Sequence, residues 1–433
     1  MIDINLKESI RRLIVWILTL EAQAALRKYK PKIAVVTGSV GKTSTKDALY
    51  ATLSKRFFVR RSEKSYNSDI GVPLTILGVP NGWSDPFRWL RNIIEGFLLI
   101  VLKAPYPEWL LVEVGADRPG DISRSLSWLS PDLVIATRFP DIPVHVEFYG
   151  SPEEVAKEEL SPISWLKEGG LLVVNADDEK ASAAAPAGTT VISYGFKKEA
   201  DVRAHHFRIT AKNKTPTGIS FDVSYGGEQV HLALPGLIGR GHAYAVLGGI
   251  ASGVLLGMPF TDAALAAGNY KSPPGRIRTI DGVKGSTIID DSYNASPVAT
   301  EEALDTLSHV PRRGRRIAVL ADMLELGNFS AEEHRRIGKL VASSADLLVA
   351  VGVRAHGIAE GAREAGMAPE AILEYEEGES AAVRLLPLIA DGDVLLIKGS
   401  QSMRMEKVSK TLMKEPEKAK DFLPRQDADW LTR

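Results

Sequence analysis

The segment at residues 33–47, IAVVTGSVGKTSTKD, constrains the fold more than any other part of the sequence. Its first four residues are apolar and predict a buried strand, and the run from Lys42, which lacks Gly and Pro, predicts a helix. A glycine-bearing turn between a strand and a helix is a typical phosphate site, because unsatisfied backbone N–H groups and the helix dipole attract an anion there. An ordinary turn that carries a lysine is the alternative, and the flanking strand and helix favour the phosphate site.

The turn also provides the side chains that a nucleotide phosphate requires. Lys42 can reach the β- and γ-phosphates, and the Thr43 hydroxyl can reach Mg²⁺. A strict P-loop would have glycine where Val36 stands, so the match is to a shorter GxxGKT form. The residues predicted to bind the phosphates are Thr37, Gly38, Ser39, Val40, Gly41, Lys42, Thr43 and Ser44.

Composition narrows the possible classes of protein. A chain of 433 residues is long enough for two or three domains, and 45% apolar with 25% charged residues is typical of a globular protein. The net charge of −1 provides no basic field, so we expect no nucleic-acid partner. The absence of cysteine excludes disulfides, thiolate metal sites and a cysteine nucleophile, and the eight histidines show no zinc-type spacing.

Residues 1–30 predict an N-terminal amphipathic helix, and two apolar runs lie at 13–20 and 93–102. Both runs are shorter than the roughly 18–20 residues that cross a bilayer, and no signal peptide is evident. Two interpretations stay open: core or dimer helices, or helices that touch a membrane surface through apolar faces flanked by basic residues. We expect a cytoplasmic protein, which the second interpretation would place at the inner membrane surface.

The rest of the chain predicts an α/β fold with two domains after the N-terminal helix. Strands at 110–114, 133–137 and 170–174 alternate with helical stretches, which favours a P-loop-type, mostly parallel sheet. Short strands within 190–234 predict a small antiparallel annex to that sheet. The segment KSPPGR at 271–276 predicts a hinge, after which a Rossmann-like α/β domain follows. The predicted units are therefore 1–30, a central nucleotide-binding domain at 31–273, and a C-terminal domain at 274–433.

Polar residues follow several of these strands, where ligands of parallel sheets bind. Glu113 ends a strand and suits Mg²⁺, although a helix-capping role is equally compatible with its position. His145 lies in a later loop, and a single histidine is more often structural. Asp291 and its neighbours can hold a ribose and adenine or cap a helix, and Lys398 can meet an anion. Two domains that bring such residues to a hinge suit closure around a nucleotide and a substrate.

A series of segments occurs in one order over residues 30–410: TGSVGKTS (37–44), YNSDIGVPLTIL (66–77), VEVGADRPGDI (112–122), HVEFYGS (145–151), NADDE (175–179), PGR (274–276), DDSYNASP (290–297), LADMLELG (320–327) and IKGSQSMRMEKV (397–408). This series resembles the Mur ligases, the ATP-dependent amide-forming enzymes of peptidoglycan synthesis. DDSYNASP and LADMLELG resemble in particular the branch that adds D-alanyl-D-alanine to a UDP-linked tripeptide.

The resemblance implies a reaction and a set of residues. ATP would phosphorylate a substrate carboxylate, and an amine would attack the acyl phosphate to form an amide. The implied cofactors are ATP and Mg²⁺, and the implied partners are a small amino substrate and a carboxylate like that of a peptidoglycan precursor. The implied catalytic residues are Lys42, His145, Glu159 and Arg276; the metal ligands Thr43, Glu113 and His145; the ribose and adenine contacts Asp291, Tyr293 and Asn294; and the substrate contacts Asn67, Lys398 and Ser400.

The sequence departs from the family pattern in three places. The N-terminal domain that grips the UDP-sugar is replaced by a helix of about 30 residues, so a lipid-linked or polymeric acceptor, membrane contact or a partner chain stays open. Glu159 aligns with the family's carbamylated lysine, and its carboxylate would bridge Mg²⁺ without a need for CO₂. His242-Ala243 stands where His-Asn is expected.

The expected function is an ATP-dependent carboxylate–amine ligase that joins D-Ala-D-Ala or another amino substrate to a peptidoglycan-precursor peptide. The alternatives are a ligase of the folylpolyglutamate synthase or polyglutamate type, and a nucleotide-binding homologue without catalysis. Relatives of the former type also lack the UDP-sugar domain, whereas DDSYNASP and LADMLELG favour the first function.

Overall fold

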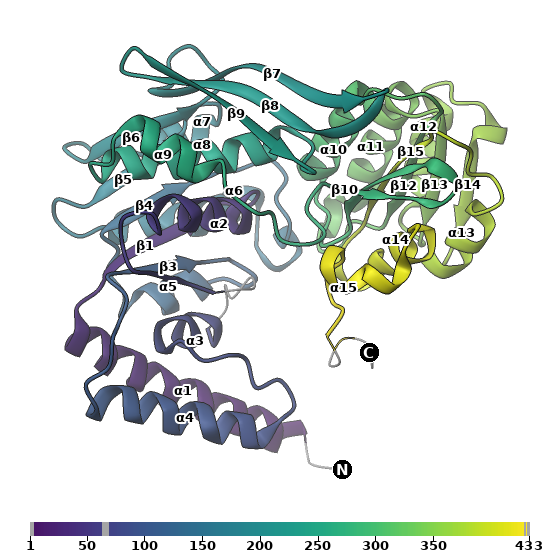
Figure 1. The fold of residues 1–433 in the computed structure, drawn as a ribbon. Helices are drawn as coiled ribbons and strands as arrows, with labels where there is room; N and C mark the ends of the chain where they lie inside the picture. Colours follow the sequence, from purple (N-terminus) through teal and green to yellow (C-terminus); the bar gives the residue numbers. More distant parts are fainter. Residues whose placement is uncertain (1–3, 63–68, 428–429, 431–433) are drawn as a thin grey trace.

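The computed structural model describes residues 4–62, 69–427 and 430, and it arranges them around two sheets (Figure 1). The first sheet has nine strands in the order β2-β3-β1-β4-β5-β6-β7-β8-β9, and the second has six in the order β10-β11-β15-β12-β13-β14. The α/β fold class predicted from the sequence is confirmed. The domain limits at 30 and 273 stay a prediction.

The first sheet is parallel over the part that carries the phosphate loop. Its parallel strands are β1 (Lys32–Thr37), β2 (Val59–Arg61), β3 (Trp109–Glu113), β4 (Leu133–Ala136), β5 (Leu171–Asn175) and β6 (Thr190–Gly195). Strands β1, β3 and β4 are buried almost along their whole length because helices cover both faces of the sheet, which explains their unbroken apolar runs.

The predicted antiparallel annex continues this same sheet. Strand β7 (Val202–Lys212) pairs in parallel with β6 at its start, and then pairs antiparallel with β8 (Thr215–Tyr225), which pairs with β9 (Glu228–Pro235). The annex therefore extends the edge of the first sheet and forms no separate layer, as Figure 1 shows at the top of the molecule.

Two apolar cores lie on the two faces of the first sheet. On one face, α2 (Lys42–Leu53), α8 (Arg240–Leu255) and α9 (Phe260–Ala267) pack over one core. On the other face pack α1 (Ile4–Tyr29), α3 (Gly71–Leu77), α4 (Pro86–Val101), α5 (Asp121–Leu126) and other short elements, among them α6 (Pro152–Leu160) and α7 (Glu179–Ala183). A Cβ on Gly249 of α8 would lie 3.0 Å from the Ala48 carbonyl, so the small residues of α8 allow it to pack closely on α2.

The second sheet is parallel except at one edge. Strand β10 (Arg278–Asp281) runs antiparallel to β11 (Thr287–Asp291), and β12 (Arg316–Ala321), β13 (Leu347–Val351), β14 (Ile372–Tyr375) and β15 (Val394–Lys398) are parallel. The helices around this sheet are α10 (Pro297–His309), α11 (Ser330–Ser344), α12 (His356–Glu364), α13 (Gly378–Leu385), α14 (Glu406–Leu412) and α15 (Ala419–Phe422). Separate apolar cores on its two faces hold these helices.

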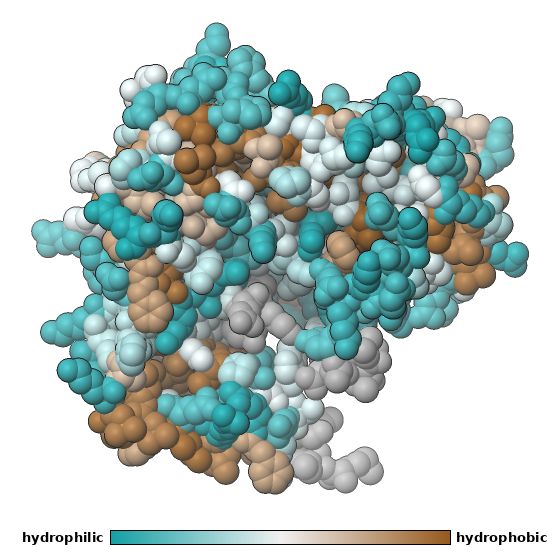
Figure 2. Space-filling view, viewed as in Figure 1, coloured by the Kyte–Doolittle hydropathy of each residue, from teal (hydrophilic) through white to brown (hydrophobic). Residues whose placement is uncertain are grey.

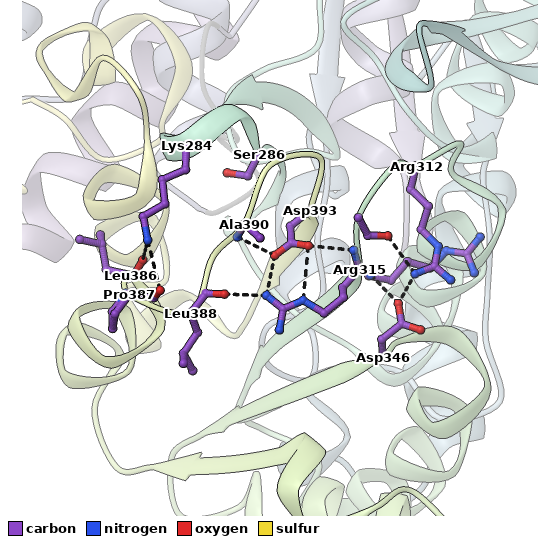
Figure 3. A network of polar contacts seen from close by, with 12 residues as sticks. Lys284, Ser286, Arg312, Arg315, Asp346, Leu386, Pro387, Leu388, Ala390 and Asp393 are labelled. Atoms are coloured by element: carbon purple, nitrogen blue, oxygen red, sulfur yellow. Dashed lines mark hydrogen bonds and ion pairs between the residues drawn. The ribbon is translucent and has the colours of Figure 1, made fainter.

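A polar network lies at the end of the second sheet where the central strands β12 and β15 begin (Figure 3). The buried carboxylate of Asp393 accepts hydrogen bonds from the backbone N–H groups of Arg315 at 2.8 Å and Ala390 at 3.0 Å. The Arg315 guanidinium also donates to Asp393 at 2.7 Å. The starts of the two central strands are thus linked by hydrogen bonds. Their carboxyl ends lie at the opposite end of the sheet, where a ligand can bind.

Candidate active site

The carboxyl ends of the parallel strands in both sheets open into one cleft of about 1200 Å³. The first sheet contributes the phosphate loop and the end of β3, and the second contributes the ends of β11 and β15. The predicted site residues that line the cleft are Ser39, Val40, Gly41, Lys42, Thr43, Ser44, Glu113, His145, Arg276, Asp291, Tyr293, Asn294, Lys398 and Ser400. Thr37 and Gly38 form the start of the loop and Glu159 contacts it, but these three residues do not line the cleft. Asn67 lies outside the residues that the structure describes.

The phosphate loop requires glycine at two positions. Gly38 has φ +127°, and a Cβ there would lie 2.2 Å from Thr137 Oγ1 and 3.1 Å from the Arg138 backbone nitrogen. Gly41 has φ +88° and caps α2 without a side-chain hydrogen bond. The N-terminus of α2 therefore faces the cleft with its first-turn N–H groups, which is the arrangement that binds a phosphate.

Lys42 folds back over the loop. Its ammonium donates to the backbone carbonyls of Gly38 and, at 3.4 Å, Ser39, and it lies 3.9 Å from Glu159 Oε1. The Lys42 side chain is 14% exposed, so the lysine reaches the cleft while most of its stem is covered. This position allows its charge to face a phosphate that is bound at the loop.

Glu159 comes from α6 and lies against the loop although it is far away in the sequence. The Ser39 hydroxyl donates to its carboxylate, and the Thr37 hydroxyl donates to its backbone carbonyl. Burial raises the pKa of Glu159, while Lys42 and the Ser39 hydrogen bond act in the opposite direction. The Glu159 carboxylate thus lies in direct contact with the phosphate loop.

Thr43 and Glu113 form a pair of oxygen ligands at the end of β3. The Thr43 hydroxyl donates to Glu113 Oε1 at 2.9 Å, and both side chains are buried. The buried Lys46 ammonium lies 3.7 Å from Glu113 Oε2, and it donates to the Ser62 carbonyl and hydroxyl at 3.0 Å each. A hydroxyl and a carboxylate are hard oxygen ligands, so this pair fits Mg²⁺ with water and phosphate as its other ligands.

His145 lies where the two sheets face each other. Its Nδ1 contacts the Glu325 carboxylate from the second unit, and its Nε2 lies 3.4 Å from Asp117 Oδ1. The hydrogen bond with His145 lowers the pKa of Glu325. His145 therefore stands between two carboxylates, and together they form a polar cluster that a second cation can approach.

The second unit contributes a linked group at the end of β11 and β15. The Lys398 ammonium donates to the Asp291 carboxylate and to the Asn294 carbonyl at 3.0 Å. The Arg276 guanidinium lies 4.1 Å from the centre of the Tyr293 ring, which is a cation–π distance. The contacts of Lys398 with Asp291 and Asn294 hold these residues in place at the wall of the cleft.

Ser400 and His242 also line the cleft and make internal hydrogen bonds. The Ser400 hydroxyl accepts from the Leu324 N–H at 2.8 Å, and His242 Nε2 lies 3.1 Å from the Ile277 carbonyl. Burial lowers the pKa of His242 to about 4, so its imidazole is neutral at ordinary pH. Ala243, the unexpected neighbour of His242, is fully buried in the core beneath α8.

Several residues in and around this site were not predicted from the sequence. Lys46 lies one helical turn after Lys42, and that spacing was its only signal. Arg425, near the C-terminus, donates to the Tyr293 carbonyl at 3.0 Å and the Ser292 carbonyl at 2.6 Å. Trp430 lines the cleft, and the centre of its ring lies 6.1 Å from that of Trp83. No periodicity in the C-terminal segment indicated these contacts.

Comparison with known families and proteins agrees with this architecture. Residues 36–87 and 96–253 match the Mur ligase middle domain, and residues 275–401 match the Mur ligase glutamate ligase domain. The UDP-N-acetylmuramoyl-tripeptide--D-alanyl-D-alanine ligase of Bacillus subtilis is 26% identical over 404 residues, which cover 91% of this chain and 79% of the relative. The ligase of the same name from Escherichia coli is 28% identical over 404 residues, which cover 90% of this chain and 79% of the relative.

Among solved structures, the MurF ligase of Thermotoga maritima in complex with ADP has the same fold, with a TM-score of 0.74 and 24% identity. The superposition covers 94% of this chain and 84% of that protein. The two domain matches, the order of the motifs and the shared fold lead to one conclusion: the chain belongs to the Mur ligase family.

Proposed function

We propose that this protein is an ATP-dependent, ADP-forming ligase that joins D-Ala-D-Ala to the carboxylate of a peptidoglycan-precursor peptide. The observation that carries the proposal is a single cleft in which Lys42, Thr43 and Glu113 face Asp291 and Lys398 from the other sheet. The first group suits a triphosphate with its metal ion, and the second suits the nucleoside. The names of the bacterial relatives supply the identity of the amine and of the acceptor.

In the proposed reaction, a carboxylate oxygen of the acceptor attacks the γ-phosphorus of ATP, and the bond to the β-phosphate oxygen breaks to release ADP. The amine nitrogen then attacks the acyl carbon, phosphate leaves with the electron pair of the C–O bond, and the amine loses a proton. Lys42 and the first turn of α2 neutralise the phosphate charge, and Arg276 approaches it from the hinge segment. Mg²⁺, held by Thr43 and Glu113, would neutralise the developing phosphate charge.

We further propose that Glu159 takes the place of the carbamylated lysine of the family. Its buried carboxylate lies 3.9 Å from the Lys42 ammonium and accepts a hydrogen bond from Ser39, so a fixed negative charge already faces the loop. The enzyme would then need no CO₂ to assemble its site.

The proposed activity is tested by measuring phosphate release with ATP, Mg²⁺, D-Ala-D-Ala and UDP-MurNAc-tripeptide, and with each substrate omitted in turn. Release that requires both substrates, together with the amide product in mass spectrometry, is the expected result. Turnover that instead depends on glutamate and a folate or a glutamate polymer would favour the alternative ligase. Nucleotide binding without turnover on any of these substrates would favour the non-catalytic homologue.

We also propose that the outer faces of α1 and α4 rest on an anionic membrane at the cytoplasmic side. The two helices lie side by side, and the Lys28 ammonium and Tyr29 hydroxyl donate to the Leu99 carbonyl at 3.1 and 2.9 Å. Large apolar side chains remain outside this contact, with Trp16 59% and Phe87 81% exposed. Figure 2 shows the apolar surface at the lower left of the molecule, over α1 and α4.

The charges around this surface favour a lipid over a protein or a second copy of the chain. Within the described side chains of 9–30 and 86–103, seven lysines and arginines are exposed and no aspartate or glutamate is exposed. They are Arg11, Arg12, Arg27, Lys28, Lys30, Arg91 and Lys103. Acidic side chains nearby are few: Glu95 pairs with Arg91 at 2.7 Å, Asp69 pairs with Arg11 at 3.1 Å, and Asp85 caps the start of α4. Apolar and aromatic side chains flanked mainly by cations are typical of helices that lie in the membrane interface. No helix in the described part of the chain has the length and hydropathy needed to span a bilayer.

Co-sedimentation with vesicles tests this contact. We expect binding to phosphatidylglycerol-containing vesicles, weaker binding to pure phosphatidylcholine, and loss of binding when Trp16 and Phe97 are both replaced by serine. Val353→Ser is the matched control, because Val353 is 75% exposed and lies in the second unit. The proposal is contradicted if the protein does not bind anionic vesicles. It is also contradicted if the protein sediments as a dimer and the double substitution of Trp16 and Phe97 abolishes that dimer.

A further inference from the structure

We propose that the outer face of the annex binds a divalent transition-metal ion of the Zn²⁺ class through His205, His206 and Asp222. These three residues are brought together by the pairing of β7 with β8. None of them lines the cleft between the two sheets, so the site is separate from the proposed active site.

Strand pairing aligns three of the relevant side chains in one row. His205 of β7 is paired with Asp222 of β8, and Asp222 is paired with His231 of β9. Directly paired residues of antiparallel strands point to the same face of a sheet. Phe221 and Val223, on either side of Asp222, are fully buried, so this row lies on the outer face.

A β-bulge adds a second imidazole to the row. The pairing shifts between His205 and Arg208, so that His206 and Phe207 lie opposite Phe221 alone. His206 has φ +52°, in the left-handed region that this type of bulge normally fills with glycine. Without the extra residue, His205 and His206 would point to opposite faces. The bulge instead places their rings 4.8 Å apart.

The donor atoms are already gathered. One ligand atom each from His205, His206 and Asp222 lie within 4.8 Å of one another. His206 Nδ1 lies 2.8 Å from Asp222 Oδ2, and His231 Nδ1 lies 2.7 Å from Asp222 Oδ1. His205 Nδ1 is buried and has no hydrogen-bond partner within the described part of the chain. Two imidazoles and a carboxylate are a typical Zn²⁺ ligand set, and His231 would orient the carboxylate from its other oxygen.

The strain at His206 supports the same inference. A left-handed conformation costs an ordinary residue free energy that glycine avoids, so a histidine at this position calls for a compensating contact. Its side chain is 77% exposed, and packing supplies little compensation. Its contact with Asp222 supplies part of the compensation, and a bound cation that joins β7 to β8, with His231 linking β9, would supply more. It would hold β7, β8 and β9 together close to the point at which β7 stops pairing with β6.

The strain also provides a sharp test, because His206→Gly removes a ligand and relieves the backbone at the same time. Untagged full-length protein, freed of metals with a chelator, is titrated with ZnCl₂ by calorimetry, and Co²⁺ is used to read the ligand field by absorption. We expect one Zn²⁺ per chain with a micromolar Kd and a rise in the melting temperature of several degrees. His206→Gly should fold normally and bind at least tenfold more weakly.

His309→Ala is the matched control, since His309 is an exposed histidine that lies beside an aspartate, Asp305, on α10. It should bind Zn²⁺ like the parent. The proposal is overturned if the parent binds no Zn²⁺ at 100-fold excess, or if His206→Gly and His231→Ala bind as tightly as the parent. ADP formation should be the same in His206→Gly and the parent, which separates this site from the proposed ligase function.

Discussion

Replacement of Glu159 by glutamine removes one charge beside the phosphate loop and keeps the size of the side chain. Lys42 Nζ lies 3.9 Å from Glu159 Oε1, and two unit charges at that distance attract each other by about 4 kcal/mol at an effective dielectric constant of about 20. Each 1.36 kcal/mol corresponds to a factor of ten in rate. Complete loss of the attraction between Lys42 and Glu159 would therefore lower the rate by at most about 1000-fold. The Gly38 carbonyl also holds Lys42 in place, and we therefore expect kcat/KM to fall by about 30- to 300-fold.

The same substitution should leave folding intact. Burial raises the pKa of Glu159, which means that burial of its charge is costly, and a neutral amide avoids that cost. The free energy of unfolding in urea should therefore stay the same or increase while kcat/KM falls. Glu154→Gln, on the exposed side of α6, is the control and should behave like the parent in both assays.

ADP release under steady-state conditions, measured with and without dissolved CO₂, completes the experiment. The parent should keep its rate after CO₂ is stripped, because a glutamate needs no carbamylation. A Glu159→Gln enzyme within twofold of the parent would refute the assigned role. If the rate of the parent enzyme falls without CO₂ and recovers with bicarbonate, the role assigned to Glu159 belongs to a carbamylated lysine instead.

Three further predictions concern the loop and the second sheet. Lys42→Ala should abolish turnover and weaken ATP binding in calorimetry, and full activity would remove the phosphate role of the loop. Gly38→Ala should lower the free energy of unfolding by about 2 kcal/mol or more, because its Cβ would lie 2.2 Å from Thr137 Oγ1 and its φ is +127°; unchanged urea midpoints would contradict this. Burial raises the pKa of Asp290 to about 7 from 3.8, so the folded carboxylate keeps its proton where the unfolded one loses it. The free energy of unfolding should fall as pH rises from about 4 to 7, by up to about 4 kcal/mol, and Asp290→Asn should lack this loss when urea unfolding is compared at pH 5 and 8.

The sequence predicted the elements whose signals are local. The buried central strands appear as unbroken apolar runs, and the loop at 37–44 carries its own glycine and lysine pattern. Strands β10 and β14 were not predicted, because they lie at the two edges of the second sheet and are only partly buried. Edge strands lack the apolar run that a central strand requires.

The site could be predicted only in part for a related reason. The contacts of Lys46 with Glu113 and Ser62, and the position of Arg425 at the cleft, depend on packing between distant segments. Glu159 was identified through the family resemblance alone, because a glutamate in a charged helix has no local signal. The cluster around Asp222 was invisible because a bulge and a strand register assemble it, and the sequence intervals match no zinc motif.

The indoles of Trp83 and Trp430 meet edge to face, with 76° between the ring planes, and they form a contact between the two units in addition to the chain connection at 271–276. Rotation of the two units about that segment would separate these rings, since they belong to different units of the molecule. Indole emission responds to its surroundings, so the intrinsic fluorescence of the unlabelled protein would report each opening in real time. The pair is thus an internal optical probe of any rotation between the two units.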